Sequence, residues 1–361
     1  THKQQMAVMF GGLFVAFGLL VYYLSSSVNF SESLQLAGAM GKTKVIDTSW
    51  DPTTKYTLWS GLIGGFFLQL SYFGTDQSQV QRYLGGESIR QARMGLLLNG
   101  LLKIPMQFFI LLIGVLVFVF YLFNPEPLHW NDANLKTAHE LDKTTVTAQL
   151  EAEHTTLITQ RTFFVKELVA AQREGDEAKA GLVQRQVEQL NTRDAELKVD
   201  FQEHLAALAP KADTNDKDYI FITWVMDHLP VGVIGLLLAM IFCAGMGSTS
   251  SQLSALATTA VVDIFRSSRS GQDQVIATKW ATVAFGILAL LFAAIFPLFE
   301  NLIQAVNILG SLFYGTILGI FLVAFFIKRI QGTAVFFAGL LTQAIILIHF
   351  ALDHYNVFAV M

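Results

Sequence analysis

The stretch that decides the fold is MGLLLNGLLKIPMQFFILLIGVLVFVFYLF, which runs from Met94 to Phe123. It is long enough to cross a membrane as a helix, because a hydrocarbon core about 30 Å thick needs about 20 apolar residues. Lys103 lies roughly 14 Å from its start, near the middle of such a core. An ammonium there costs roughly 2.5–3.5 kcal/mol even on lenient scales. We therefore expect Lys103 to face a wet cavity or a partner, and to indicate a functional site.

The composition of the whole chain is that of a membrane protein. Hydrophobic residues make up 53% and charged residues 14%, the mean hydropathy is +0.48, and there are 30 Phe. The single cysteine, Cys243, excludes a disulfide within the chain and gives no support to a cysteine metal site. The net charge of −4 is a sum over apolar stretches and one acidic soluble segment, so it says little about binding partners. Nothing in the sequence indicates nucleic acid as a partner.

Seven apolar stretches are long enough to span a bilayer, and their links set the orientation. Three links rich in Arg and Lys alternate with links poor in both, so the positive-inside rule places the basic links in the cytoplasm. We predict an all-α, multi-pass protein of the cell inner (plasma) membrane that begins in the cytoplasm, ends outside, and is part of a longer protein. The predicted spans are about Met6 to Leu24, Tyr56 to about Leu84, Met94 to Phe123, about Val231 to Phe265, about Val275 to Phe296, about Leu302 to Ile327 and about Thr333 to Leu352.

One long connection on the outer side differs from the short links. Residues 124–218 are polar, with apolar residues at spacings of 3, 4 and 7, such as Leu150, Leu157 and Phe164. That periodicity predicts an antiparallel helical hairpin with its turn at Gly175 to Gly181. The predicted domains are therefore residues 1–123, the hairpin 124–218, and residues 219–361. The hairpin is either a solvated spacer arm or a docking surface for an extracytoplasmic partner.

The second span contains a polar block, from Tyr72 to Arg82, that follows an apolar helix without a loop. A broken membrane helix whose polar break lines a cavity is typical of the substrate site of a secondary transporter. The alternative is that Asp76 marks the cytoplasmic end of the span and pairs with Arg82. Lys103 favours the first interpretation, because a buried ammonium needs a counter-charge and Asp76 is the nearest candidate in the neighbouring span.

The fourth span holds a hydroxyl-rich segment, Ala244 to Ser254, in its centre. Hydroxyl and carbonyl oxygens suit a monovalent cation such as Na⁺, and the lack of a carboxylate cluster argues against Ca²⁺ or Mg²⁺. Small residues also favour close helix packing, and Ser or Thr can bond back to the previous turn. Both interpretations remain open here, and the same ambiguity holds for Gln304 and Asn307 in the sixth span.

Four segments together resemble the sodium/solute symporter family, and most closely its sodium/sugar cotransporter branch. They are FGTDQSQVQRYL (Phe73 to Leu84), LLKIPM (Leu101 to Met106), GMGSTSSQLSALATTAVVDIF (Gly245 to Phe265), and Ile303-Gln304 with Gly310 downstream. The resemblance implies part of a five-plus-five inverted-repeat fold, namely its fifth to tenth core helices and one further helix. The outer hairpin has no counterpart in the family.

The resemblance also implies the chemistry of the site. It points to sodium-coupled symport of a small polar solute, most simply a sugar or polyol, by alternating access with Na⁺ as the coupling ion. Because QVQRYL also resembles the branch that carries iodide, monocarboxylates and vitamins, an organic anion such as a monocarboxylate or sialic acid, or an amino acid, is the alternative. Implied substrate residues are Tyr72, Phe73, Asp76, Lys103, Gln304 and Asn307, and the sodium candidates are Ala244, Ser248 and Ser251.

Three positions depart from the family pattern. Gly247 stands where the family often has a second Ser, so one hydroxyl ligand is missing. His2 replaces an Asp at the start of the first span, which puts a second cation site in doubt. The distance from Gln304 to Gly310 is one residue shorter than in the sugar branch, which weakens the assignment of Asn307.

Two other classes of protein fit the sequence less well. A membrane-anchored sensor would use the outer hairpin as its input, but the cytoplasmic links are too short to hold an output module. A membrane hydrolase would need convergent nucleophile and base groups, whereas His349 and His354 fall near the outer end of the last span with no convergent acid, and His139 lacks a second histidine at metal spacing. We therefore expect a transporter and not an enzyme.

Overall fold

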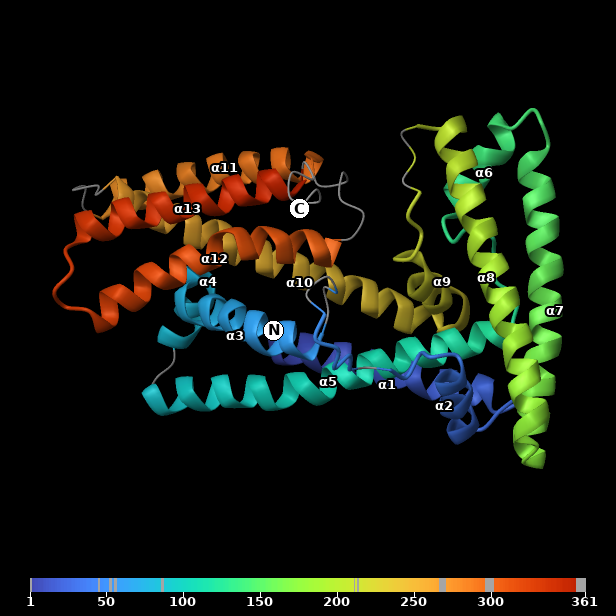
Figure 1. The fold of residues 1–361 in the computed structure, drawn as a ribbon. Helices are drawn as coiled ribbons and strands as arrows, with labels where there is room; N and C mark the ends of the chain where they lie inside the picture. The colour runs from blue at the N-terminus through green and yellow to red at the C-terminus, as the bar shows by residue number, and fades with distance from the viewer. Residues whose placement is uncertain are drawn as a thin grey trace. The chain divides into compact units, whose positions relative to one another are not determined.

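A computed structural model describes residues 2–44, 46–51, 54, 57–85, 88–210, 212, 214–265, 271–295 and 302–354. Every regular element in these residues is helical, as the sequence predicts (Figure 1). The helices in chain order are α1 (His2–Leu24), α2 (Phe30–Ala39), α3 (Leu58–Thr75), α4 (Gln77–Leu84), α5 (Ile89–Phe123), α6 (Asp132–Leu141), α7 (Val146–Glu174), α8 (Glu177–Leu208), α9 (Tyr219–His228), α10 (Val231–Thr258), the π-helical η1 (Thr259–Ile264), α11 (Gln272–Ile295), α12 (Leu302–Phe326) and α13 (Gly332–His354).

Six segments of the described residues are long and apolar enough to cross a membrane. They are Met6–Leu24, Ile89–Phe123, Val231–Ile264, Gln272–Ala294, Ile308–Phe326 and Gly332–Leu352. Six of the seven predicted spans are thereby recovered. The remaining one, predicted from Tyr56 to Leu84, is divided at Asp76 into the shorter helices α3 and α4, and neither is among the six.

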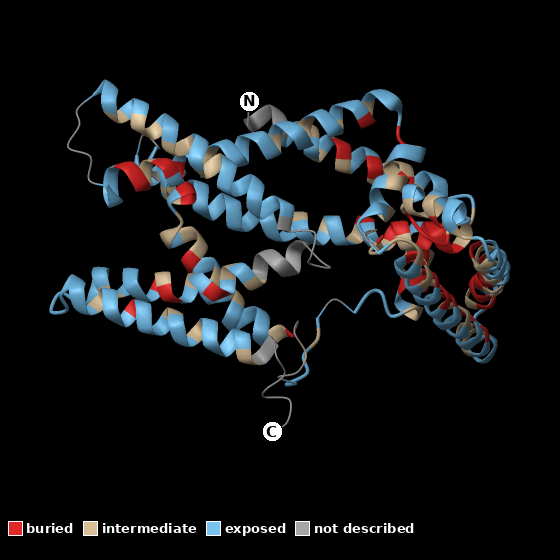
Figure 2. Cartoon of the chain, turned by 90° about the horizontal axis from the view of Figure 1, so that it is seen from above, coloured by how far each residue is buried: buried red, intermediate tan, exposed pale blue. Residues whose placement is uncertain are grey.

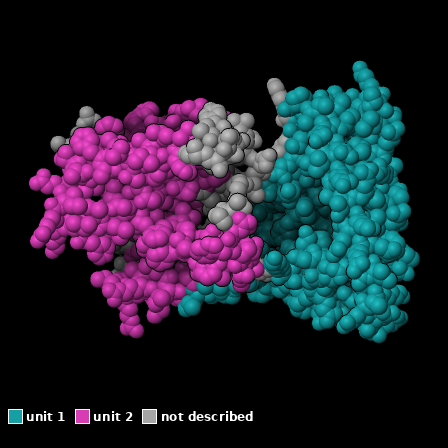
Figure 3. All heavy atoms as spheres, viewed as in Figure 1, with its two compact units in different colours: residues 1–45, 101–246 teal, residues 46–100, 247–361 magenta. Residues whose placement is uncertain are grey.

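The chain divides into two compact units, which Figure 3 colours teal and magenta. Unit 1 comprises Thr1–Val45 and Leu101–Met246, and unit 2 comprises Ile46–Gly100 and Gly247–Met361. Unit 1 therefore contains α1, α2, most of α5, and α6 to α9. Unit 2 contains α3, α4 and α11 to α13, and α10 contributes to both.

The predicted outer hairpin is the largest helix pair of unit 1. Gly175 ends α7 with φ 71°, a left-handed conformation that costs glycine little, and its N–H caps the helix at the Gln172 carbonyl at 3.3 Å. The turn is shorter than predicted, because Gly181 already lies inside α8. Figure 2 shows the buried residues gathered in this region, whereas the apolar spanning helices are mostly exposed in the absence of lipid.

An aromatic cluster joins the membrane helices α1 and α5 of unit 1 to the short helix α9. The Phe17 ring of α1 lies 5.2 Å from Phe109 of α5. Further along α5, Phe120 lies 4.9 Å from the imidazole of His228, which stacks on the fully buried Trp224 of α9 at 5.3 Å. Such ring pairs add to the stabilisation by buried apolar area. Helix α9, which the sequence analysis did not predict, is therefore part of this core.

A bidentate ion pair connects α2 to the hairpin. Arg173 near the end of α7 donates to both carboxylate oxygens of Glu32, at 2.8 and 2.9 Å. The hydrogen bond from Arg173, together with the backbone N–H of Asn29, lowers the pKa of Glu32 to about 2. The same glutamate completes a capping box with Asn29, which explains why a short helix begins in a link predicted only as a loop.

Unit 2 is built around α12, which packs against both α3 and α13. The η1 segment continues α10 for one turn with a wider helix, in which the Phe265 N–H donates to the Ala260 carbonyl at 2.9 Å. Single π-turns of this kind occur often near functional sites. Because α12 packs on α3, residues of α12 such as Tyr314 lie beside the polar end of α3.

Candidate functional site

The helix break predicted from the polar block of the second span is present, and it falls at Asp76. This residue has an extended backbone (φ −71°, ψ 116°), ends α3 and begins α4. Its Oδ1 accepts hydrogen bonds from the Ser78 N–H at 2.8 Å, the Ser78 hydroxyl at 2.7 Å and the Gln79 N–H at 3.4 Å. Asp76 is therefore the N-cap of α4, which neither interpretation of the sequence included.

Tyr72 and Phe73 precede the break on the last turn of α3. The Gln79 side-chain amide donates to the Tyr72 hydroxyl at 2.7 Å, so a bond from α4 crosses the break and fixes the phenol. Ser78 and Gln79 are buried, whereas Tyr72, Phe73 and Asp76 are half-buried. In the part of the chain that the structure describes, no hydrogen bond to Asp76 Oδ2 is found, so this oxygen is available to a ligand.

The break lies against α12, and two residues that sequence reasoning missed form the contact. Ser71 is fully buried and donates to the backbone carbonyl of Tyr314 at 2.9 Å. The Tyr72 and Tyr314 rings lie 6.4 Å apart. Thr75 hydrogen-bonds Ser71 at 3.2 Å, which adds another hydroxyl to the cluster. The result is a hydroxyl-rich polar cluster within otherwise apolar helices.

The two substrate residues predicted in the sixth span, Gln304 and Asn307, lie in the first turns of α12 after Leu302. The backbone of this turn is helical, which agrees with the prediction of a sixth span. Several predicted side chains lie outside the described part of the chain, and their roles stay predictions. They are Gln304, Asn307, Arg82 and His2.

Lys103 lies on α5 and is exposed in the absence of lipid. The proline two residues later, Pro105, lies inside the same helix and has no N–H to offer the Leu101 carbonyl one turn earlier. A cation and a carbonyl that lacks its usual helical donor therefore occur within one turn of an apolar span. Lys103 belongs to unit 1 and Asp76 to unit 2, so the predicted pairing of the two remains a prediction.

The sodium candidates all lie on α10. Ala244 and Ser248 are four residues apart and so share one face of this helix, which runs without a break from Val231 to Thr258. The Ser251 hydroxyl donates to the Ser248 carbonyl at 3.2 Å, which is the back-bonding weighed above as the alternative to ion binding. Ser248 is exposed, so its hydroxyl can turn toward an ion. The structure thus leaves Ser248 as the best placed of the three.

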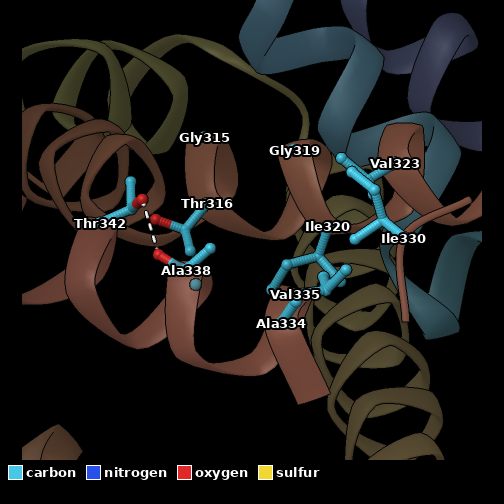
Figure 4. A pocket seen from close by; sticks show the side chains of 11 residues that line it. Gly315, Thr316, Gly319, Ile320, Val323, Ile330, Ala334, Val335, Ala338 and Thr342 are labelled. Carbon is cyan, nitrogen blue, oxygen red and sulfur yellow. Dashed lines mark hydrogen bonds between the residues drawn. The ribbon is translucent and has the colours of Figure 1, made fainter. Parts of the chain in front are cut away.

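A separate apolar cavity of about 400 Å³ lies between α12 and α13 (Figure 4). Glycines and small aliphatic residues line it, and the Thr342 hydroxyl there bonds back to the Ala338 carbonyl at 2.8 Å. The Thr316 hydroxyl is buried and has no hydrogen-bond partner among the described residues. None of the predicted site residues lines this cavity, and it offers no ionisable group to a solute.

A carboxylate and histidine group in unit 1 has metal-like spacing but is already neutralised. Ligand atoms of Glu126, His154 and Asp194 lie within 4.8 Å of one another. However, Arg161 and Lys198 both bond Glu126 at 3.1 Å, and Lys198 bonds Asp194 at 2.9 Å. Two cations on the same oxygens would repel a metal ion, so we interpret this group as the ionic core of the hairpin.

Comparison with known proteins bears on the α10 and α12 region. Residues 199–342, which include both helices, match the family model described as Sodium:solute symporter family. The predicted family resemblance is confirmed. Together with the six apolar helices, it identifies the chain as multi-pass membrane protein sequence. No solved structure matches the chain.

Curated relatives share short parts of the chain. The human sodium/iodide cotransporter is 32% identical over 123 residues, which is 34% of this chain and 18% of that protein. The sodium/sialic acid symporter of Proteus mirabilis is 30% identical over 119 residues, 31% of this chain and 24% of that protein. The mouse sodium-coupled monocarboxylate transporter 2 is 29% identical over 99 residues, which is 27% of this chain and 16% of that protein. The chain thus spans less than a quarter of the length of these relatives.

Proposed function

We propose that the full-length protein performs sodium-coupled secondary active symport of a small polar solute across the plasma membrane, by alternating access. The broken helix at Asp76 carries this proposal. It places a capped carboxylate and the Tyr72 hydroxyl at an interruption of an apolar helix, where transporters build substrate sites. The match of residues 199–342 to the symporter family supports the same function, and transport rather than catalysis.

The solute is an organic or inorganic anion rather than the sugar or polyol favoured by the sequence. The names of the relatives indicate iodide, sialic acid and monocarboxylates, all of which are anions at neutral pH. A cation inside an apolar span, Lys103, suits such a solute, because a buried ammonium is stabilised by an opposite charge. Tyr72, Phe73, Gln304 and Asn307 would complete the pocket, and a neutral sugar remains the alternative.

Sodium would bind beside α10, with the Ala244 carbonyl and the Ser248 hydroxyl as ligands and Ser251 as a weaker candidate. Oxygen ligands of this kind suit a hard monovalent cation. Coupling then requires that Na⁺ and the solute bind one conformational state better than the other, since only a difference in affinity can shift the equilibrium.

The architecture proposed for the full-length protein is a five-plus-five inverted repeat to which this chain contributes seven spans. Six are the long apolar segments, and α3 and α4 together form the other, which is second in chain order. Residues 1–123 and 219–361 would belong to the transport body, and residues 124–218 to an extracytoplasmic hairpin. The remaining sodium and solute ligands would come from helices outside this chain.

The test is uptake by the full-length protein in proteoliposomes, with an inward Na⁺ gradient or an equal K⁺ gradient. The solutes are iodide, a monocarboxylate, sialic acid and a neutral hexose. We expect Na⁺-dependent uptake of an anion. Uptake of every solute at equal rates in Na⁺ and K⁺ would refute the coupling, and uptake of the hexose alone would restore the sugar assignment.

Variants of Lys103 then separate the two solute classes. With an anion, Lys103→Gln leaves a buried negative charge unpaired at a cost of about 3–5 kcal/mol, and uptake should fall more than 100-fold. With a neutral polyol the amide still donates, so affinity should fall by less than the about 1.5–3 kcal/mol of a charged hydrogen bond. Lys279→Gln, at the cytoplasmic end of α11, is the matched control. Full activity of Lys103→Met would show that the charge has no part in transport.

A further inference from the structure

We propose that unit 1 carries a phospholipid-binding site at the end of α5 nearest the hairpin, with the phosphate held by Lys42 and Lys217. The site goes beyond the transport function and does not depend on which solute is carried. Two adjoining cavities with different character suggest it. One, the apolar chamber, has a volume of about 750 Å³. The other, the polar chamber, has a volume of about 670 Å³ and is lined by charged and polar side chains together with apolar ones.

The two cavities share part of their lining, most of it on α5. Lys42, Gly114, Val117, Phe118 and Ile220 line both of them. An amphiphile with a polar head and an apolar tail matches such a pair of chambers, whereas a small polar solute or an apolar peptide segment matches only one. The chemistry of the lining therefore indicates a lipid.

The apolar chamber lies on helices that a bilayer surrounds. Its lining includes Ile110 to Phe118 of α5 and Leu13 of α1, and both segments belong to candidate spans. An acyl chain is the apolar group present at this depth of a membrane. On the proposed topology, this end of α5 lies in the outer leaflet.

Two lysines stand at the rim of the apolar chamber and supply the charge for a phosphate. The ion pairs found among the described residues include neither Lys42 nor Lys217, and both side chains are exposed to the cavity or solvent. The Lys42 ammonium lies 5.0 Å from the centre of the Phe118 ring, at the junction of the two chambers. Asp218 also lies at this rim, so the local charge is two cations against one anion.

The backbone at Lys42 is fixed by the end of α2. Gly41 has φ 70°, and the Lys42 N–H donates to the Ala37 carbonyl at 2.9 Å, while the Gly41 N–H donates to Gly38 at 2.9 Å. This pair of bonds is a Schellman turn, which closes the helix and fixes the backbone from which the Lys42 side chain extends. A charge held in place at the membrane interface, near the Phe118 ring, is suited to a lipid phosphate.

The polar chamber can hold the rest of a headgroup. Its cations Arg161 and Lys198 are engaged by Glu126 and Asp194, so they do not compete with the lysines for the phosphate. A third carboxylate, Glu188, also lines this chamber, so the phosphate belongs at the two lysines and only neutral groups of the headgroup belong here. Asn191 and Thr192 add an amide and a hydroxyl to the lining, which can bond the hydroxyl groups of a glycerol headgroup.

Gly114 offers a direct way to block the site. It lines both chambers, and a Cβ added there would meet no atom within 4 Å, so a substitution can begin without backbone strain and extend its side chain into the lining of the cavity. Gly100 of the same helix is equally open and serves as the matched control. Lys179 on α8, which is exposed, is the control for the lysines.

The experiment is native mass spectrometry of the purified full-length protein titrated with dioleoyl phosphatidylglycerol or with dioleoylglycerol, which has the same chains and no phosphate. We expect phosphatidylglycerol to bind at least tenfold more tightly than dioleoylglycerol. Gly114→Trp should lower that affinity at least tenfold while Gly100→Trp does not. The double variant of Lys42→Gln and Lys217→Gln should remove the preference for the phosphate, and Lys179→Gln should retain it.

Three results would overturn the proposal. Equal affinity for the two lipids would mean that no phosphate is recognised. A preference that survives the double lysine variant would place the lipid elsewhere. Displacement of the lipid by glycerol phosphate, which has no chains, would indicate a site for soluble phosphate esters. Should Gly114→Trp fail to fold, the lysine variants decide the question, because both lysines are exposed.

Discussion

Replacing Asp194 with asparagine should loosen the hairpin, because it removes one of four charges that lie between α7, α8 and the end of α5. Arg161 and Glu126 form a pair at 3.1 Å, with side chains only 5% and 10% exposed. Asp194 is 8% exposed, accepts from His154 at 2.7 Å and binds Lys198 at 2.9 Å. The two cations and two anions balance, and the substitution leaves one positive charge in excess.

The size of the effect follows from burial. Breaking a buried ion pair typically costs about 3–5 kcal/mol. Lys198 is 27% exposed and keeps its bond to Glu126, and asparagine can still accept from His154, so we expect the lower part of this range or less, about 2–3 kcal/mol. That free energy corresponds to a roughly 30–140-fold larger population of the open helix pair, and to exchange that is faster by the same factor.

Hydrogen exchange of the full-length protein measures this opening directly. Peptides from α7 and α8 should exchange faster in Asp194→Asn, while peptides from α12 and α13 in unit 2 should not change. Glu153→Gln is the matched control, because its pair with Arg193 joins the same two helices at 2.8 Å but is about half exposed and screened by water. Equal exchange in the two variants would refute the view that the buried charges stabilise the hairpin.

Acidification tests the same network. Burial opposes ionisation of Asp194, but the hydrogen bond from His154 and the charge of Lys198 outweigh it, so its pKa lies below the usual value. A carboxylate with a lowered folded-state pKa stabilises the fold fully above its unfolded pKa of about 3.9, and this contribution is lost as the pH falls through the folded value. The difference in exchange between wild type and Asp194→Asn should therefore be constant from pH 8 to about 5 and shrink below about pH 4.

Three further predictions concern transport, topology and packing. Ser248→Ala should raise the Na⁺ concentration for half-maximal uptake by the full-length protein, whereas an unchanged Na⁺ dependence would favour helix packing as the role of the serines. A cysteine at Glu174, in a Cys243→Ser background, should react with a membrane-impermeant thiol reagent outside the inner membrane, and labelling only after that membrane is opened would invert the topology. Ser71→Val should lower stability by about 1–3 kcal/mol in thermal unfolding, because the Tyr314 carbonyl loses its buried donor, and an unchanged midpoint would contradict this bond.

The membrane helices could be predicted from the sequence because a single physical signal defines each of them. Apolar length alone placed the last span at Thr333 to Leu352, and the observed helix α13 runs from Gly332 to His354. The break at Asp76 was also visible, since Gly74 and a run of polar residues weaken a membrane helix. Its capping geometry was not predicted, because it depends on which oxygen meets which N–H group.

The hairpin shows why a pattern of apolar letters identifies a helix but not always its buried face. The periodicity of α7 rests on residues that include Leu157 and Phe164, which are only half-buried, and Leu168, which is fully buried. The face that α8 covers holds Ile158 together with His154 and Arg161, which are 3% and 4% exposed. The sequence alone does not distinguish a charged residue that is buried beside a partner on another helix from one that is exposed to water. The ion pairs of Arg161, Glu126, Asp194 and Lys198 could therefore not be predicted from the local sequence.

The contact between Ser71 and Tyr314 was invisible for a related reason, since it joins residues 243 positions apart through a backbone carbonyl. Any residue at position 314 could supply that carbonyl. A serine in an apolar helix indicates that some acceptor is near, but the acceptor is chosen by the packing of α3 on α12.

Asp76 shows how a structural and a functional role can share one carboxylate. The sequence posed them as alternatives, a helix end or a solute ligand, yet the cap uses Oδ1 alone. A solute that binds Oδ2 leaves the first turn of α4 intact. A solute that takes Oδ1 must replace the bonds from Ser78 and from the Gln79 backbone N–H. The bond from the Gln79 side-chain amide to the Tyr72 hydroxyl uses a different donor and does not depend on that exchange. A ligand that binds Oδ2 therefore leaves the helix break unchanged, whereas a ligand that binds Oδ1 must alter the start of α4.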